Sequence, residues 1–532
     1  MKKHCLLYFT AVLLFLTSCG SGGKETITPD GPTPPAPDNI IIVSQIILPY
    51  STFTIETGEN RQIIPDLFPE SATDKTVTWE SSDTSIATVS NSGVVYGKSP
   101  GTVNLIVKAG RASTVCQAIV KESHTDLSFY DIQGGRTSQR TTANCYVVSK
   151  PGKYKIPVVY GNAITNGKTN RKAYLYSGTY VSYTNVLEQF VDHLNQPIYS
   201  GNDSSDPWVS EKYSLSKGQL LWQDSQNLVT DVYLSGGQNF KEEKYLCFEV
   251  KQESFNQGNA VVAVYCDNII AWSWHIWITD SNLSPVAVRN QGNKLYYALP
   301  VNLGWCEPQS AKSKNGGKYG NCPYYQYGRK DPMLPSDGNG DFDKSYYGKS
   351  GAMNDGTWQI VTSPEEYIDA YTAVGYTVRN PFVFLCGGSS YSNLWSTEEN
   401  NYFINGQVIK SVYDPSPSGY CVPPYDFPTG FARYVDSFCD LNCDGVFNNG
   451  YYFYTDGWKQ GEKLFLPAIG ERFYNGILFG AGDCGYYHLA ENLVEYLGSP
   501  RCFYYIGSIA SFISSSGIGR GEALPVRSIK EY

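Results

Sequence analysis

Two acidic, glycine-containing segments carry side chains that could bind calcium. In one of them Asp440, Asn442 and Asp444 alternate with other residues just before a glycine, and residues 337–343 show a similar pattern. Calcium takes several oxygen ligands from carboxylate and amide groups on a tightly turning backbone, which this spacing supplies. The twelfth position of the first segment is Tyr451 rather than the bidentate glutamate of an EF-hand loop. The pattern therefore predicts either a calcium site at Asp440, Asn442 and Asp444 or solvated turns held by the same side chains.

Aromatic side chains from residue 290 onward form a second group that could bind a ligand. The chain contains 43 tyrosines, 23 phenylalanines and 10 tryptophans but only 3 methionines, so these rings can equally well fill a core. An aromatic face beside Asn, Asp and Arg side chains suits carbohydrate, because it combines a flat apolar surface with hydrogen-bonding groups. The ligand contacts expected on this basis are Trp305, Tyr324, Tyr325, Trp395, Trp458, Tyr486 and Tyr487.

No motif indicates an enzyme, and we expect no catalytic residues. The chain has five histidines and lacks the P-loop, G-x-G-x-x-G, H-E-x-x-H and G-x-S-x-G patterns. His275 has no serine or cysteine nucleophile motif beside it; the run Trp272-Ser273-Trp274-His275-Ile276-Trp277 indicates either a sugar-stacking strand or a strand buried on both faces. The net charge of −9, without a block of Lys and Arg beyond the signal, argues against nucleic acid as a partner.

The N-terminus contains a candidate lipid attachment site. Two lysines precede an apolar run, residues 5–16, that is too short to span a bilayer as a helix and suits a secretory signal. Leu16-Thr17-Ser18-Cys19 resembles a bacterial lipobox, whose cysteine is diacylated and begins the mature protein. The resemblance implies that Cys19 anchors the chain to a membrane, since each buried methylene contributes about 0.8 kcal/mol. A plain signal peptide with an incidental Cys19 is the alternative.

A tether and a first β-domain should follow the signal, residues 1–19. Residues 20–39 are rich in Gly and Pro and indicate an extended, solvated linker. Residues 40–121 contain short alternating runs separated by turn residues, as in a small β-sandwich. This part resembles the bacterial Ig-like domain, group 2, in the pattern Trp79…Ser82-Asp83…Ile86-Ala87-x-Val89…Gly93-x-Val95…Gly97…Gly101. The resemblance implies a stalk or adhesive module without catalytic residues.

Two further domains are expected. Residues 122–285 are rich in strands, and the segments Ala143-Asn144-Cys145-Tyr146 and Gln257-Gly258-Asn259-Ala260-Val261 resemble a module of surface lipoproteins of the Bacteroidetes type, including fimbrillin-like proteins. Residues 286–532 contain, in order, Pro323 to Pro332, Val412 to Pro423, Leu464 to Gly470, Gly485-Tyr486-Tyr487 and Pro525-Val526-Arg527-Ser528. This series resembles the Fibrobacter-type major paralogous (FISUMP) domain.

The resemblance to the FISUMP domain implies a C-type-lectin-like α+β fold. The chain departs from the family at Ser528, where a cysteine is usual, and at His488, where a tryptophan often follows Gly-Tyr-Tyr. The first departure puts a family disulfide in doubt, and the second changes a stacking surface. An exported location permits disulfides, and we expect some in the last domain together with some buried free thiols.

Together these patterns predict a multidomain, mainly β protein: an Ig-like β-sandwich, a second β-rich module and a C-terminal α+β C-type-lectin-like domain. The predicted function is a cell-surface lipoprotein that is held in the outer membrane through Cys19. It would bind an extracellular glycan or protein through the C-terminal domain, with no cofactor other than calcium. The alternative is a structural subunit of a fimbrial or surface assembly, built by strand addition.

Overall fold

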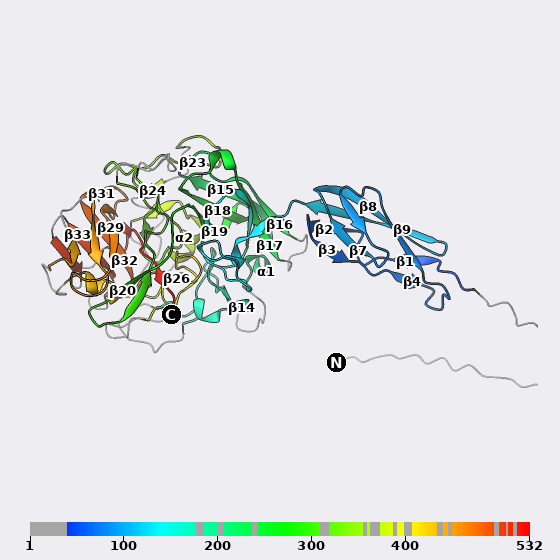
Figure 1. The fold of residues 1–532 in the computed structure, drawn as a ribbon, viewed down its shortest axis with the longest axis horizontal. Helices are drawn as coiled ribbons and strands as arrows, with labels where there is room; N and C mark the ends of the chain where they lie inside the picture. The colour runs from blue at the N-terminus through cyan, green and yellow to red at the C-terminus, as the bar shows by residue number, and fades with distance from the viewer. Residues whose placement is uncertain are drawn as a thin grey trace, which may run out of the picture. The chain divides into compact units, whose positions relative to one another are not determined.

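The computed structural model divides into two compact units, residues 1–122 and 123–532. Both consist mainly of β-strands, which confirms the prediction of a mainly β, multidomain protein (Figure 1). Cys19 and the predicted tether lie outside the described residues. These residues are 40–176, 186–199, 207–236, 243–308, 319–354, 359–361, 373–386, 391–397, 407–432, 440–444, 449–493, 499–506, 509–513 and 519–532.

The N-terminal unit is a β-sandwich. One sheet has the strand order β2-β9-β8-β5, a second has the order β3-β7-β6, and β1 pairs with β4. Its strands are β1 (Gln45–Ile47), β2 (Thr52–Glu56), β3 (Asn60–Gln62), β4 (Asp66–Phe68), β5 (Val77–Ser81), β6 (Ala87–Val89), β7 (Val94–Gly97), β8 (Gly101–Ala109) and β9 (Ala112–Lys121).

Alternation of side chains builds the core of this unit. Along β8, Val103, Leu105 and Val107 are buried while the residues between them are exposed or half-buried, as the period of a strand requires. Phe53 from the first sheet and Val95 from the second belong to the same buried cluster, so the core lies between the sheets. The prediction of a small β-sandwich in this part of the chain is therefore confirmed.

The C-terminal unit contains two larger sheets in its first half. One has the order β10-β12-β17-β16 and the other β11-β19-β18-β15-β23, and β13 pairs with β14. The elements of this part, including three 3₁₀-helices (η), are β10 (Thr125–Asp126), η1 (Leu127–Phe129), β11 (Cys145–Val148), β12 (Gly152–Pro157), β13 (Ile164–Thr165), β14 (Lys168–Thr169), η2 (Arg171–Ala173), α1 (Val209–Lys212), β15 (Leu215–Gln223), β16 (Thr230–Gly236), β17 (Lys244–Val250), η3 (Gln252–Ser254), β18 (Gly258–Cys266) and β19 (Ile269–Ile278).

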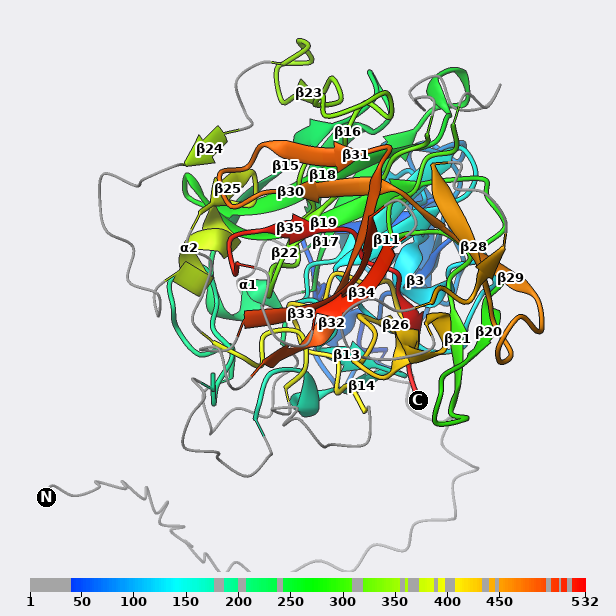
Figure 2. The same cartoon turned by 90° about the vertical axis from the view of Figure 1, so that its left-hand side faces the viewer.

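The second half of this unit consists of short strands joined by long loops. The sheet β22-β35-β30-β32-β33-β34 also carries β31 on β30, and Figure 2 shows β31, β30, β35 and β22 one beside the next. Smaller sheets are β20-β21-β36-β26, β27-β28-β29 and β24-β25. The elements are β20 (Val286–Arg289), β21 (Leu295–Ala298), β22 (Tyr325–Gln326), β23 (Tyr347–Gly348), β24 (Gln359–Val361), α2 (Ala373–Arg379), β25 (Val383–Leu385), β26 (Tyr420–Cys421), η4 (Phe427–Phe431), β27 (Cys443–Asp444), β28 (Gly450–Tyr454), β29 (Lys463–Pro467), β30 (Ile469–Arg472), β31 (Leu478–Ala481), β32 (Cys484–Leu493), β33 (Ser499–Ile506), β34 (Ile509–Ile513), β35 (Ala523–Leu524) and β36 (Ile529–Lys530).

The predicted boundary between residues 285 and 286 falls inside this unit. Strand β23 pairs with β15, with Gly348 opposite Trp222, and Cys145 of β11 forms a bridge with Pro417. The side-chain amide of Asn144 donates to the carbonyl of Val412 at 2.6 Å. Segments 122–285 and 286–532 therefore share one core, because strands and loops of one pair with those of the other.

Strand β19 passes through the middle of that core. Trp272, Trp274, His275 and Trp277 are all buried, so both faces of the strand are covered. A sugar-stacking surface on this strand is therefore wrong, and burial on both faces is the correct interpretation. His275 bonds Asn259 through Nε2 at 2.9 Å, and burial lowers its pKa to about 3.

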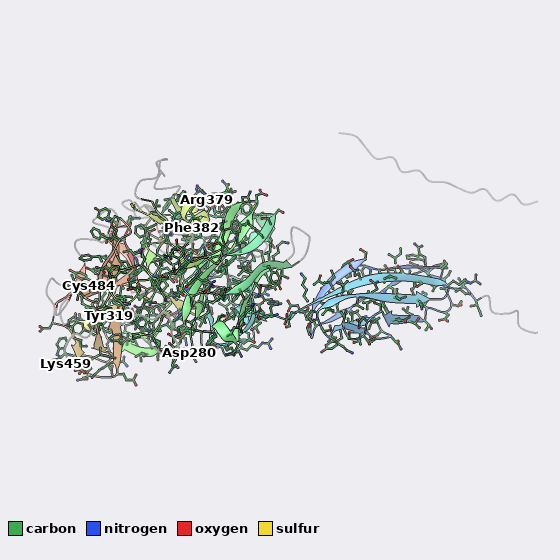
Figure 3. The ribbon with its side chains drawn as sticks, turned by 90° about the horizontal axis from the view of Figure 1, so that it is seen from above. Asp280, Tyr319, Arg379, Phe382, Lys459 and Cys484 are labelled. Carbon is green, nitrogen blue, oxygen red and sulfur yellow. The ribbon has the colours of Figure 1, made fainter. Side chains whose placement is uncertain are left out.

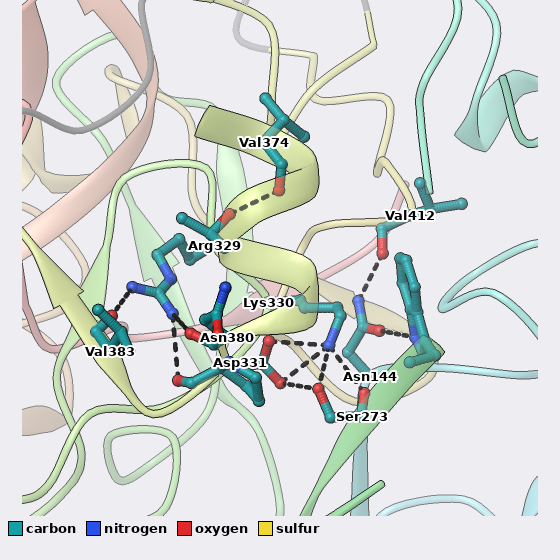
Figure 4. Close-up of polar contacts among 12 residues, drawn as sticks. Asn144, Ser273, Arg329, Lys330, Asp331, Val374, Asn380, Val383 and Val412 are labelled. Carbon is teal, nitrogen blue, oxygen red and sulfur yellow. Dashed lines mark hydrogen bonds and ion pairs between the residues drawn. The ribbon is translucent and has the colours of Figure 1, made fainter. Parts of the chain in front are cut away.

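Charged side chains are buried beside this strand (Figure 4). Nζ of Lys330 donates to both carboxylate oxygens of Asp331, at 2.9 and 2.8 Å, and to the hydroxyl of Ser273 at 2.6 Å. The guanidinium of Arg329 donates to the carbonyls of Val383, Asn380 and Pro381. Arg329 thus satisfies three backbone carbonyls at the start of β25 and just before it, and Lys330 is balanced by a buried carboxylate.

The cysteines that the structure describes do not form the expected disulfides. No two of them are joined, and most are buried. Ser528 is buried, and its hydroxyl shares a hydrogen bond of 2.9 Å with the hydroxyl of Ser416. This is the position at which we noted a serine in place of an expected cysteine.

Across the described part of the chain, no helix has both the length and the apolar character needed to cross a membrane.

Candidate functional site

A polar cleft of about 510 Å³ opens on the C-terminal unit, where three loops meet. The loops follow β20, η4 and β28, and the last of them carries the predicted ligand residue Trp458. The lining residues are Arg289, Asn290, Gln291, Asn293, Gly430, Ala432, Asn442, Asp456, Gly457, Trp458 and Gln460.

The turn between β20 and β21 forms the first wall. Asn290 is buried, and its side-chain amide donates to the carboxylate of Asp426 at 3.0 Å while its Oδ1 accepts the amide of Lys294 at 2.8 Å. Asn293 adopts a φ of 62°, a left-handed conformation that Asn tolerates better than most residues. Asn290 therefore fixes the turn that presents Arg289, Gln291 and Asn293 to the cleft.

Gly430 allows the second wall to come close to the first. A Cβ atom at this position would meet the carbonyl oxygen of Arg289 at 2.3 Å, so any larger residue would push the two loops apart. Nε2 of Gln291 donates to the carbonyl of Ala432 at 2.5 Å and ties the same two loops together.

Asn442 joins the second wall to the third. Its Nδ2 donates to the carbonyls of Gly430, at 2.8 Å, and Gly457, at 2.9 Å. Its Oδ1 accepts the backbone amide of Lys459 at 2.6 Å. Because this buried carboxamide satisfies three backbone groups, its role in the structure is to hold the cleft in shape.

The hairpin loop between β28 and β29 forms the third wall. The amide of Asp456 donates to the carbonyl of Gln460 at 3.1 Å, and Lys459 has a φ of 51°, which closes the loop tightly. Lys459 is exposed and lies at the periphery of the unit in Figure 3. Trp458, between them, is half-buried and lines the cleft.

An ion pair crosses the cleft. Nε of Arg289 donates to Oδ1 of Asp456 at 2.8 Å, and the two side chains are 40% and 60% exposed. Nη1 of Arg289 also reaches Asn293 at 3.4 Å, whereas Nη2 makes no hydrogen bond to the described residues. A guanidinium has five N–H donors in a planar fork, so Arg289 keeps donors available to a ligand.

Six of the seven predicted ligand residues are core residues instead. Trp305, Tyr324, Tyr325, Trp395, Tyr486 and Tyr487 are each 7% exposed or less, so their faces cannot stack on an external ligand. Their polar atoms are also engaged: Nε1 of Trp395 donates to the carbonyl of Arg329 at 3.1 Å, and the hydroxyl of Tyr487 to that of Pro467 at 2.6 Å. The structure places these six in the interior, three of them in strands: Tyr325 in β22, and Tyr486 and Tyr487 in β32.

The predicted calcium ligands are also used differently. The oxygen of Asn442 already accepts a backbone amide, Asp444 forms an ion pair with Lys463, and Asp440 is exposed. In the second acidic segment, Asp337 accepts the amide of Asn339 at 2.7 Å, as in a solvated turn. No group of three or more His, Cys, Asp and Glu side chains in the described ranges is placed to hold a metal ion. The turn interpretation therefore fits Asp337, whereas Asn442 is neither a calcium ligand nor part of a solvated turn, because it is buried and holds the loops of the cleft.

Most of the cleft could not be predicted from sequence patterns. Residues 290–293 and 456–461 carry turn signals rich in Gly, Asn and Asp, which indicate loops. Nothing in that signal shows that the two loops meet, since about 160 residues separate them and only their packing brings them together.

Comparisons with known proteins identify the class of the N-terminal unit. Residues 42–119 match the family model of the bacterial Ig-like domain (group 2), which confirms that prediction. A segment of 84 residues is 37% identical to an Ig-like virion protein of Serratia phage KSP90; it covers 15% of this chain and 33% of that protein. The chain thus spans about a third of that relative.

Solved structures show weaker likenesses. Domains 4 and 5 of the S-layer protein SbsC are 21% identical with a TM-score of 0.14, over 16% of this chain and 54% of that one. A GH10 xylanase with a bacterial Ig-like domain, from termite gut, is 16% identical with a TM-score of 0.13, over 18% of this chain and 25% of that one.

Proposed function

We propose that this protein binds a glycan at the cell surface, through the cleft beside Trp458. The observation that carries this proposal is the combination of a half-buried indole with Arg289, Asp456 and side-chain amides around one open cleft. Sugars present apolar C–H faces and many hydroxyl groups, so they suit an aromatic face surrounded by both donors and acceptors.

The cleft also has the stiffness that binding requires. Asn442 and Asn290 fix the three loops through hydrogen bonds to backbone and carboxylate groups, so the loops do not have to be ordered by the ligand. A pre-formed site avoids the entropy loss of ordering side chains on binding.

The remaining parts of the chain support a location at the surface. An Ig-like domain over residues 42–119 fits an adhesive or structural module between an anchor and a binding unit. The lipobox-like segment ending at Cys19 supports attachment to the outer membrane. We do not assign an enzymatic activity, because the described residues of the cleft offer no nucleophile with an adjacent base.

A glycan array probed with the lipid-free chain, residues 20–532, tests this function. The two sides of the 285/286 boundary share one core, so a shorter fragment that begins at 286 would not be a fair test. We expect binding to one class of glycan, and Trp458→Ala should weaken it at least tenfold, about 1.4 kcal/mol.

Tyr452→Ala is the matched control, since Tyr452 is a 53% exposed aromatic residue of β28 outside the cleft lining. It should leave the affinity unchanged. A silent array, or equal binding by Trp458→Ala and the parent chain, would contradict the proposal. Polymers of the lipid-free chain seen by electron microscopy, together with a silent array, would favour the structural alternative.

A further inference from the structure

A second cluster of reactive side chains lies outside the cleft, in the interior of the C-terminal unit. It consists of Asp224, which follows β15, Asn321, and Lys344, which precedes β23. The three residues are 2%, 0% and 5% exposed. An amine, a carboxylate and a carboxamide thus meet in a place from which bulk water is excluded.

The geometry brings the amine to both partners. Nζ of Lys344 lies 3.1 Å from Oδ2 of Asp224 and 3.2 Å from Oδ1 of Asn321. Asn321 is held by paired backbone hydrogen bonds with Cys306, at 2.8 and 3.1 Å. Asp224 is held by Asn259, whose backbone and side-chain nitrogens donate to it at 2.7 and 2.9 Å. None of the three groups has to be recruited from solvent.

The charges at the cluster hold Lys344 as an ammonium beside a carboxylate. Burial acts to lower the pKa of Lys344, but the neighbouring Asp224 and Cys306 outweigh it and raise that pKa above its usual value. Sγ of Cys306 is 3.9 Å from Nζ, and burial raises the pKa of this thiol to about 12, so it stays neutral. Asp224, with Oδ2 at 3.1 Å from Nζ, is therefore the carboxylate whose position allows it to relay protons from the ammonium.

We propose that Lys344 and Asn321 form an intramolecular amide cross-link. Nζ of Lys344 attacks Cγ of Asn321, the Nζ–Cγ bond forms, and the bond between Cγ and Nδ2 breaks. Two protons of the lysine ammonium pass through Asp224 to the departing nitrogen, which leaves as ammonium. Atoms and charge balance without an oxidant or cofactor, and the chain becomes lighter by about 17 Da, the mass of ammonia.

Proximity makes this reaction feasible without an external enzyme. Carboxamides react with amines very slowly in water. The reaction is faster when the two groups are held in contact and oriented, because the effective molarity then reaches about 10⁵ M or more. Lys330 is the internal contrast, because its neighbours Asp331 and Ser273 include a carboxylate but no carboxamide. The cross-link would close a loop between positions 23 residues apart and so restrain the unfolded chain.

Peptide mapping of the purified full chain by tandem mass spectrometry tests the cross-link. Trypsin should yield residues 319–329 joined to residues 331–349, uncleaved after Lys344, with a mass about 17 Da below the sum of the two peptides. Separate, unmodified peptides with cleavage after Lys344 would overturn the proposal.

Two variants exclude other sources of the mass loss. Lys344→Arg keeps a cation beside Asp224 but has no comparable nucleophile, so the joined peptide should disappear, while Lys330→Arg should retain it. A loss of 17 Da on residues 319–329 that persists in Lys344→Arg indicates a succinimide at Asn321 and overturns the proposal. A join between Lys344 and Asp224, with loss of water (about 18 Da), overturns it as well.

Discussion

The two units reach a stable β-fold in different ways. In the N-terminal unit the core is apolar, and the ion pair between Lys108 and Glu80 stays on the surface with side chains 57% and 65% exposed. In the C-terminal unit Lys330, Arg472 and Arg527 are almost completely buried. Long strands satisfy their own backbone groups, whereas a loop-rich unit needs other donors for its buried carbonyls.

Arg527 illustrates the second solution. Its guanidinium donates to Oδ1 of Asn302 at 2.8 Å and to the carbonyls of Leu299, Pro300 and Phe465, at 3.3, 3.1 and 2.9 Å. One cation therefore joins the segment that follows β21 to Phe465 of β29, two parts of the chain that belong to different sheets. The difference between the units teaches that loops without regular pairing can still be specified, provided that a buried donor fits them.

Replacement of Arg527 should change stability more than any other substitution that tests this difference between the units. Arg527→Leu leaves two buried and two part-buried acceptors without their donor, and each buried one costs about 1–3 kcal/mol, so the free energy of unfolding of the C-terminal unit should fall by about 4 kcal/mol. Denaturant unfolding followed by tryptophan fluorescence measures it. A loss below about 1 kcal/mol would show that water replaces the guanidinium.

Truncation in the apolar core should affect the other unit alone. Leu105 is fully buried in the cluster between the two sheets, and Leu105→Ala should lower the free energy of unfolding of the N-terminal unit by about 3 kcal/mol through lost contacts and a cavity. The unfolding transition of the C-terminal unit should not move. Equal shifts in both transitions would mean that the units unfold together.

The C-terminal unit should also lose stability as the pH rises toward 8. Burial and Glu522 raise the pKa of Glu471 to about 8, above its value near 4.5 in the unfolded chain, so its contribution is lost progressively as the pH rises from about 4.5 to about 8. Burial lowers the pKa of His275 and of His488 to about 3. These two histidines therefore reduce the stability of the unit only below about pH 6.5, where they become protonated in the unfolded chain.

Between pH 6.5 and 8 Glu471 therefore dominates, with an expected loss of about 2 kcal/mol, and Glu522, whose pKa burial raises to about 7, adds to the loss below pH 7. Urea midpoints across this range measure the loss, and Glu471→Gln should flatten most of the slope. The transition of the N-terminal unit provides an internal reference. A stability that rises toward pH 8, or a slope that Glu471→Gln leaves intact, would contradict the assignment.

The smallest effect is expected at the surface of the sandwich. Lys108→Ala removes the exposed ion pair with Glu80, and such pairs contribute about 0–1 kcal/mol because solvent and salt screen them. Thermal unfolding should shift by no more than a degree or two. A larger loss would mean that the pair is coupled to the sheet beneath it.

Sequence patterns predicted the elements better than their partners. The strands of residues 40–121 and the doubly buried strand around Trp274 followed from alternation and composition, since these depend on near neighbours. The predicted boundary at 285/286 is not a boundary in the structure. Local patterns could not show this, because the pairing of β15 with β23 joins residues more than a hundred positions apart. The aromatic residues, Trp395 among them, looked like a binding surface because ring chemistry is the same in a cleft and in a core.

The sequence by itself determined the Ig-like unit, because its period-two pattern and its turn glycines each specify a local conformation. Gly93 is one example: it needs a φ of 81°, and a Cβ there would meet the carbonyl of Ile63 at 2.3 Å. Only the tertiary structure decided the candidate site. Arg289, Asn442 and Trp458 lie on loops that no local pattern connects, and buried hydrogen bonds between those loops bring the three side chains around one cleft.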